Sequence, residues 1–189
     1  MTPGAPEAVA PGIVRVPPQE EPLSADVFIV AGREGSYVYD VGSSEAALRA
    51  LRALDGPVTV VLSHFHRDHT ANLGALSPDE VLVGARTRRQ LGRGTLVDGE
   101  RLLDGGRIRV LPSVSPHAPG CLIMLVDDTY ALVGDLCYAR PGEGQGEAQG
   151  MLRVLRKLPV RWIIQSHGRE VRLQERDELI RELRAYYGL

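Results

Sequence analysis

Short runs of β-branched and other apolar residues alternate with helical patterns along most of this 189-residue chain. Helices, recognised by apolar side chains that recur on one face, are expected at 45–54, 151–158 and 175–187. Strands are expected at 13–16, 25–31, 36–41, 58–63, 81–83, 107–111, 122–126, 130–133 and 160–165. This alternation predicts an α/β fold with two or more layers of strand.

Turn and cap residues separate several of these elements. A hairpin turn is expected at 32–35, and Asp127-Asp128 is expected to turn the chain between two further strands. Ser43 or Ser44 can cap the helix that follows them, because a serine side chain accepts a hydrogen bond from a free amide of the first turn.

Two segments lack any periodic pattern. Residues 1–10 are rich in Pro, Ala and Gly and are expected to form a flexible lead-in, which leaves 11–189 as a single domain. The alternating glycines of 140–150 predict a mobile loop, because glycine has the most backbone entropy to lose on ordering. We hypothesise that this loop borders the substrate pocket and gates it.

The composition excludes several classes of protein. The hydrophobic fraction of 43% excludes general disorder, and the formal net charge of −2 gives no reason to expect a nucleic acid as partner. No apolar run reaches the roughly 20 residues that span a bilayer, and the first residues do not resemble a secretory signal. We therefore expect a cytoplasmic protein with a small-molecule substrate. The single lysine among 22 cationic residues indicates a GC-rich bacterial genome.

Three of only five histidines follow the expected strand 58–63 directly, in the sequence His64-Phe-His-Arg-Asp-His69. Imidazoles at positions i and i+2 can converge on one ion if the segment is extended. Asp68 and His69, adjacent in a turn, would then face a different point nearby. Metal ligation explains this density of imidazoles and carboxylate, for which a structural role is hard to find.

The remaining candidates stand where other expected strands end. His117 and His167 each follow a strand, and Asp135 lies at the end of another. A lone histidine is more often a surface or hydrogen-bonded core residue than a ligand. Loops at the ends of several strands of a rigid sheet are, however, where folds assemble their sites.

Taken in order, these residues carry a resemblance to a known family. The pattern His-x-His-x-Asp-His, followed downstream by a His, an Asp and a His, resembles the metallo-β-lactamase superfamily, and the match extends over about 25–170. Flanking residues also match: Asp40-Val-Gly42, Pro116-His-Ala-Pro-Gly120 and Gly134-Asp135. The resemblance implies a four-layer αββα sandwich with a metal site at one edge of its two sheets.

The resemblance also implies a ligand set and a reaction. One metal would be held by His64, His66 and His117. The second would be held by Asp68, His69 and His167, with Asp135 bridging the two and Asp68 also a candidate catalytic residue. These ligands favour two zinc ions, although iron or manganese also suits them. Two such ions can share a hydroxide that attacks the substrate.

The leading hypothesis is therefore a binuclear zinc hydrolase that cleaves an ester, thioester, lactone or similar acyl bond. Asp135 is similar to the bridging residue of the thioesterase, lactonase and nuclease branches, and true β-lactamases of this fold lack that carboxylate. The alternatives are a phosphodiesterase or nuclease, a mononuclear iron sulfur dioxygenase, and a degenerate binding module. His66 argues against the diiron reductases, which have Glu at that position.

Three further residues lie close in sequence to the candidate ligands. Cys121 is expected to be a small buried hydrophobe, whereas for Cys137 a thiol close to the metals is equally open. Tyr138 could hydrogen-bond a substrate oxygen or pack within its loop.

Overall fold

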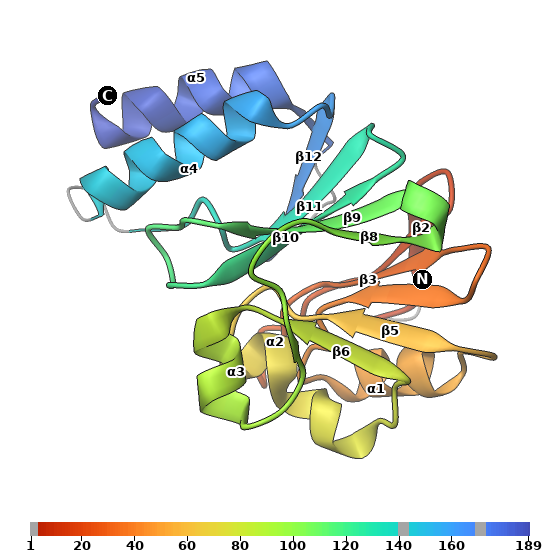
Figure 1. Cartoon of the computed structure of the whole chain (residues 1–189). Helices are drawn as coiled ribbons and strands as arrows, with labels where there is room; N and C mark the ends of the chain where they lie inside the picture. The colour runs from red at the N-terminus through yellow and green to blue at the C-terminus, as the bar shows by residue number, and fades with distance from the viewer. Residues whose placement is uncertain (1–3, 140–143, 169–172) are drawn as a thin grey trace.

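Two β-sheets lie face to face and carry helices on their outer surfaces in a computed structural model that describes residues 4–139, 144–168 and 173–189 (Figure 1). The first sheet has the order β1 (Glu7–Ala10), β2 (Ile13–Val16), β3 (Val27–Ala31), β4 (Ser36–Tyr39), β5 (Val58–Val61), β6 (Glu80–Val83) and β7 (Thr95–Leu96). The second has the order β13 (Gln174–Glu175), β12 (Trp162–Gln165), β11 (Tyr130–Gly134), β10 (Cys121–Val126), β9 (Ile108–Ser113) and β8 (Arg101–Leu103).

Helices cover the outer face of each sheet. On the first sheet these are α1 (Glu45–Arg52), α2 (Arg67–Thr70) and α3 (Ala85–Leu91), with 3₁₀ turns at Ala71–Ala75 and Asp104–Gly106 elsewhere. On the second they are α4 (Gln145–Lys157) and α5 (Arg176–Tyr187), which lie together at the top of Figure 1. The αββα sandwich predicted from the resemblance is confirmed.

Three apolar clusters hold the four layers together. Leu122 and Met124 of β10 face the first sheet, whereas Ile123 and Leu125 of the same strand pack under α4 and α5. The third cluster lies between the first sheet and α1 and includes Leu51. Since β10 is covered on both faces, all of its residues are buried, which is why its sequence is continuously apolar.

Most of the expected elements are confirmed, with ends that differ by a few residues. Ser44 is the cap of α1, and its side chain accepts a hydrogen bond from the Ala47 amide at 3.1 Å. The turn at 32–35 joins antiparallel β3 and β4. Asp127 and Asp128 both have positive φ, as a tight hairpin turn between β10 and β11 requires.

Two predictions about irregular segments are wrong in part. Glu7–Ala10 is not a flexible lead-in but forms β1, which pairs with β2 and is held by an ion pair from Glu7 to Arg15 at 2.8 Å. The segment 145–150, expected in a mobile loop, forms the first turns of α4. Gly150 is buried there, and a Cβ at its position would lie 3.2 Å from Val114, so close packing explains this glycine. Residues 140–143 of the expected gating loop lie outside the described ranges.

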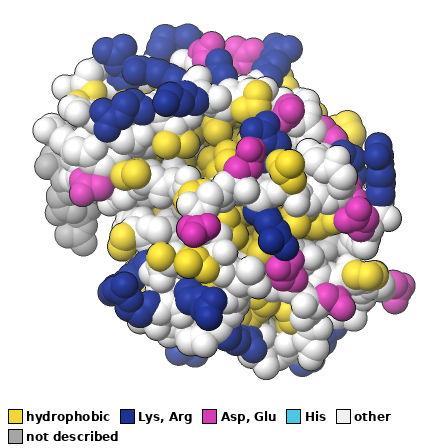
Figure 2. Space-filling model, in the orientation of Figure 1, with side chains coloured by type: hydrophobic (Ala, Val, Ile, Leu, Met, Phe, Trp, Pro, Cys, Tyr) yellow, Lys and Arg dark blue, Asp and Glu magenta, His cyan; other side chains and the backbone are white. Residues whose placement is uncertain are grey.

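Charged side chains of both signs share the surface. On the face shown in Figure 2, Lys and Arg side chains gather over α4 and α5 with Asp and Glu among them. Among the described residues, no helix combines the length and apolar character needed to cross a bilayer.

Candidate metal centre

The first four candidate ligands follow directly after the end of β5. After this strand the chain bends at Ser63 and again at Phe65, and it is extended at His66, whose backbone has φ −65° and ψ 147°. α2 then begins at Arg67, so that Asp68 and His69 stand in a helical turn. This change from extended to helical backbone aims His64 and His66 at one point and the next two candidates at another.

Three imidazoles form the first group. His64 Nε2 lies 2.9 Å from His66 Nδ1, and His117 Nε2 lies 3.0 Å from the same Nδ1. His117 comes from the loop between β9 and β10, which brings it to the other two across more than 50 residues of sequence. The three nitrogens can each offer one ligand atom to a common ion.

Two carboxylates and two imidazoles form the second group, which comprises Asp68, His69, Asp135 and His167. His167 Nε2 lies 3.1 Å from Asp68 Oδ2 and 3.3 Å from His69 Nε2. His167 follows β12 and Asp135 follows β11, so the second sheet supplies both. All seven predicted ligands are therefore brought together at one edge of the two sheets, in the two predicted sets.

Asp135 contacts members of both groups. Its Oδ2 lies 3.4 Å from His117 Nε2 of the first group, and 3.4 and 3.5 Å from Nε2 of His69 and His167 of the second. One carboxylate oxygen thus stands between the two sets of nitrogens.

Asp40 is a hydrogen-bond partner of His69, a member of the second group. This fully buried residue has φ 60°, and its Oδ2 accepts hydrogen bonds from His69 Nδ1 and from Ser63 Oγ, each at 2.7 Å. A proton held on Nδ1 leaves Nε2 of His69 directed into the second group. Asp40 belongs to the matched motif, but nothing in the sequence alone shows that it fixes this ring.

The histidines differ in charge although they are neighbours. Burial and the charge on His69 lower the pKa of His64 to about 2, so that its ring is neutral. Burial would also lower the pKa of His69, but the carboxylates of Asp40 and Asp135 outweigh it and raise the pKa to about 10. Burial would raise the pKa of Asp135, but His69 and His167 lower it to about 2.

The donor set fits a divalent cation. Nδ1 of His66 meets two other imidazole nitrogens within 3.0 Å, and one ring nitrogen cannot satisfy both through a single shared proton. Imidazole and carboxylate donors in such groups are what zinc, iron and manganese bind. The His/Asp clusters are therefore candidate sites for divalent metals.

A pocket of about 450 Å³ opens onto both groups. Its lining includes Leu23 and Tyr138, which are both exposed, and Tyr138 packs edge-on against His117 with ring centroids 5.8 Å apart. Cys121 is buried as predicted, and Cys137 is buried as well. Burial raises the pKa of each thiol to about 12, so both remain protonated.

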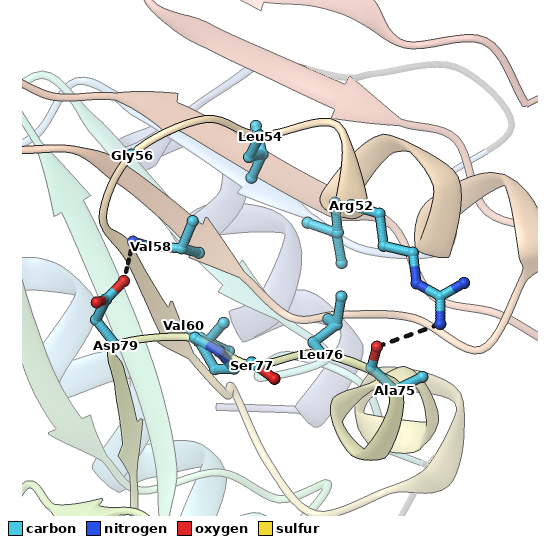
Figure 3. Close-up of a pocket in the computed structure, with 11 residues that line it drawn as sticks. Arg52, Leu54, Gly56, Val58, Val60, Ala75, Leu76, Ser77 and Asp79 are labelled. Atoms are coloured by element: carbon cyan, nitrogen blue, oxygen red, sulfur yellow. Dashed lines mark hydrogen bonds between the residues drawn. The ribbon is translucent and has the colours of Figure 1, made fainter.

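Another pocket, at the opposite end of β5, has a different character. Figure 3 shows it between the end of α1 and the segment 75–79, where Val58 donates its amide hydrogen to Asp79 at 2.8 Å. This pocket of about 210 Å³ is lined by apolar side chains, with Arg52 and Asp79 at its edges, and includes neither His nor Cys. The reactive side chains thus gather at the carboxyl end of the strand.

The close approach of the two sheets at the site makes Gly134 hard to replace. Gly134 has φ 57°, and a Cβ there would lie 2.9 Å from Ser63 Cβ. We expect Gly134→Ala to lower the free energy of unfolding of the metal-free protein by about 1–3 kcal/mol, measured by denaturant titration. Gly146→Ala is the control, because this exposed glycine of α4 has open space around it and the change should be neutral or stabilising. Equal stability of Gly134→Ala and wild type would contradict this packing argument.

Comparisons with known proteins agree with this geometry. The sequence model described as the metallo-beta-lactamase superfamily matches residues 21–87, which contain the first four candidate ligands. A search of curated proteins finds no match.

Solved structures share the fold over nearly the whole chain. The DIM-1 metallo-beta-lactamase is 16% identical with a TM-score of 0.74, over 97% of this chain and 96% of its own. A flavo di-iron protein from Thermotoga maritima is 13% identical with a TM-score of 0.71, over 95% of this chain and 61% of its own. The sec-alkyl sulfatase PisA1 is 15% identical with a TM-score of 0.70, over 98% of this chain and 41% of its own. The matched sequence model covers about a third of the chain, and together with the shared αββα fold and the order of the candidate ligands it supports the resemblance to the metallo-β-lactamase superfamily.

Proposed function

We propose that this protein is a binuclear zinc-dependent hydrolase that cleaves an ester, thioester, lactone or similar acyl bond in a small molecule. The observation that carries the proposal is the position of Asp135, whose Oδ2 lies within 3.5 Å of imidazole nitrogens from both ligand groups. A carboxylate between two such groups suits a pair of cations that share it.

Each ligand has a stated part in this proposal. His64, His66 and His117 would hold one ion, and Asp68, His69 and His167 the other, with Asp135 between them. When bound, the ions would supply a water of lowered pKa and would polarise the acyl oxygen. Asp68 lines the pocket, and it is ionised because hydrogen bonding from His167 outweighs its burial and lowers its pKa. Its carboxylate is therefore placed to orient the attacking water and accept its proton.

The pocket supports a small-molecule substrate. Its volume of about 450 Å³ lies in the range of ligand pockets, and Leu23 and Tyr138 offer an apolar edge beside the polar ligands. A metallo-beta-lactamase and a sulfatase are among the similar structures, which favours hydrolysis, but a flavo di-iron protein shares the fold too. The reaction is therefore argued from the residues rather than from the fold. That the enzyme is bacterial and cytoplasmic stays a prediction.

Metal exchange tests the proposal. Protein stripped with a chelator should lose hydrolysis of ester, thioester and lactone substrates and regain it when two equivalents of zinc are added. A phosphodiester included in the same panel separates the nuclease alternative. Faster hydrolysis of the phosphodiester than of every acyl substrate would overturn the substrate class. Acyl hydrolysis that persists without metal would overturn the mechanism.

Zinc uptake should depend on pH through His69. Because its pKa in the metal-free protein is raised to about 10, the ring carries a proton at pH 7.5 that zinc must displace, whereas His64 is already neutral. We expect affinity at the second group to strengthen as pH rises toward 10, with at least about one proton released per zinc bound there, from His69 and in part from His167, whose pKa is raised by its hydrogen bond to Asp68. Calorimetry in buffers of different ionisation enthalpy measures this number, and no release at pH 7.5 would contradict it.

The raised pKa of His69 also makes the stability of the metal-free protein depend on pH. The stabilisation from charged His69 is fully present below its unfolded pKa near 6.5 and is lost as pH rises through about 10. Denaturant titration across this range should therefore show the metal-free protein weakening, in the opposite direction to its affinity for zinc.

A further inference from the structure

A buried ion pair lies beneath the second ligand group. Arg15 of β2 is 2% exposed, and Asp26, directly before β3, is fully buried. The guanidinium of Arg15 donates to Asp26 Oδ1, to Glu7 Oε1 at 2.8 Å and to the carbonyl oxygen of Gly168. Charges so far from water need close partners, and here the partners come from three separate segments.

The other oxygen of Asp26 reaches a candidate ligand. Asp26 Oδ2 accepts a hydrogen bond from the backbone amide of His167 at 2.6 Å. His167 has φ 64°, a left-handed conformation that a residue with a Cβ rarely adopts. The Arg15–Asp26 pair thus hydrogen-bonds the amide of His167 and the carbonyl of Gly168. These two hydrogen bonds stabilise the left-handed backbone conformation of His167.

The same segment holds a second ligand. The amide of Ala25, next to Asp26, donates to the carbonyl oxygen of Asp68 at 3.0 Å. Residues 25 and 26 therefore fix two of the four members of the second group. The first group has support of another kind, since the His117 amide donates to Ser115 Oγ at 3.0 Å.

We infer that Arg15 and Asp26 are positioning residues that set the affinity of the second ligand group for a divalent ion, with little effect on the first. The inference rests on the proposed function for the identity of the ligands. Neither side chain is a ligand itself: each acts through the main chain around His167. Loss of the pair frees this chain to leave the left-handed conformation and swings the imidazole away from Asp68.

A double variant separates positioning from packing. In Arg15→Met with Asp26→Leu, apolar side chains replace the pair, an exchange that folded proteins often tolerate, while the acceptor for the His167 amide is lost. Zinc titration of the metal-free protein should show the second site weakened about 10–100-fold and the first unchanged. Asp26→Asn, which keeps the size of the side chain and one of its two acceptor oxygens, should show a smaller loss at the same site.

Glu7→Gln is the matched control. It removes a different partner of the same guanidinium. Glu7 is 43% exposed and bonds to Arg15 rather than to the main chain around His167, so both zinc affinities should stay as in wild type. Two-site binding like that of wild type in a folded double variant, or an equal loss at both sites, would overturn the inference.

Hydrogen exchange tests the hydrogen bond between the His167 amide and Asp26 in the metal-free protein. In metal-free wild type, the His167 amide should exchange as slowly as the amides of β12, and it should exchange faster in the double variant but not in Glu7→Gln. An unprotected His167 amide in wild type would overturn the inference whether or not the variants fold. If wild type takes up fewer than two ions while this amide is protected, the proposed function fails and the positioning role remains.

Discussion

Turnover should fall by at least about a thousandfold when His66 is replaced by alanine. Nδ1 of His66 is the atom that both other members of the first group approach, at 2.9 and 3.0 Å, so its loss leaves two imidazoles that no longer converge with a third. A metal ion supplies several kcal/mol of transition-state stabilisation, and each 1.36 kcal/mol corresponds to about tenfold in rate. Measurements of kcat/KM and of zinc per chain on the same samples check both parts.

Arg67→Ala is the control for this experiment. Arg67 is the next residue along the chain but is exposed and lies in neither ligand group, so zinc content and turnover should both stay at their wild-type values. Full turnover in His66→Ala, or an equal loss in Arg67→Ala, would count against the assignment of the first group.

Replacing Asp135 by alanine should weaken both ions at once. Its Oδ2 is the oxygen that approaches nitrogens of both groups, and its ionised form also balances the charge on His69. We expect the zinc content to fall below one ion per chain after dialysis and turnover to fall by about a thousandfold or more. Zinc titration with a two-site fit makes the measurement.

His66→Ala and Asp135→Ala should differ in the number of ions that they still bind. His66→Ala removes a member of one group, so the second group should still take up an ion. Asp135→Asn keeps an oxygen donor without the charge and should fall between wild type and Asp135→Ala. Two tightly bound zinc ions in Asp135→Ala would show that this carboxylate does not join the groups.

Features that depend on local sequence were predictable. The apolar run of β5 followed at once by His64-Phe-His-Arg-Asp-His69 indicated a strand that ends in a ligand cluster, because both signals lie within a few residues. The cap at Ser44 and the turn at Asp127-Asp128 depend on similarly short-range preferences.

Features that depend on tertiary contacts were not predictable in the same way. The glycines of 145–150 disfavour a helix locally, yet α4 begins there, and Gly150 within it packs against Val114 of another segment. β1 forms because β2 offers it a partner strand and Arg15 an ion pair. Asp26 gave no signal in the sequence, since its contact with His167 joins residues 141 positions apart.

The metal content and reactivity of the protein as purified test the central claim most directly. Elemental analysis per chain, with turnover of acyl substrates by the same sample, should give two zinc ions and hydrolysis that a chelator abolishes. One iron per chain, without hydrolysis of any ester, thioester or lactone, would contradict the account and favour a mononuclear iron enzyme.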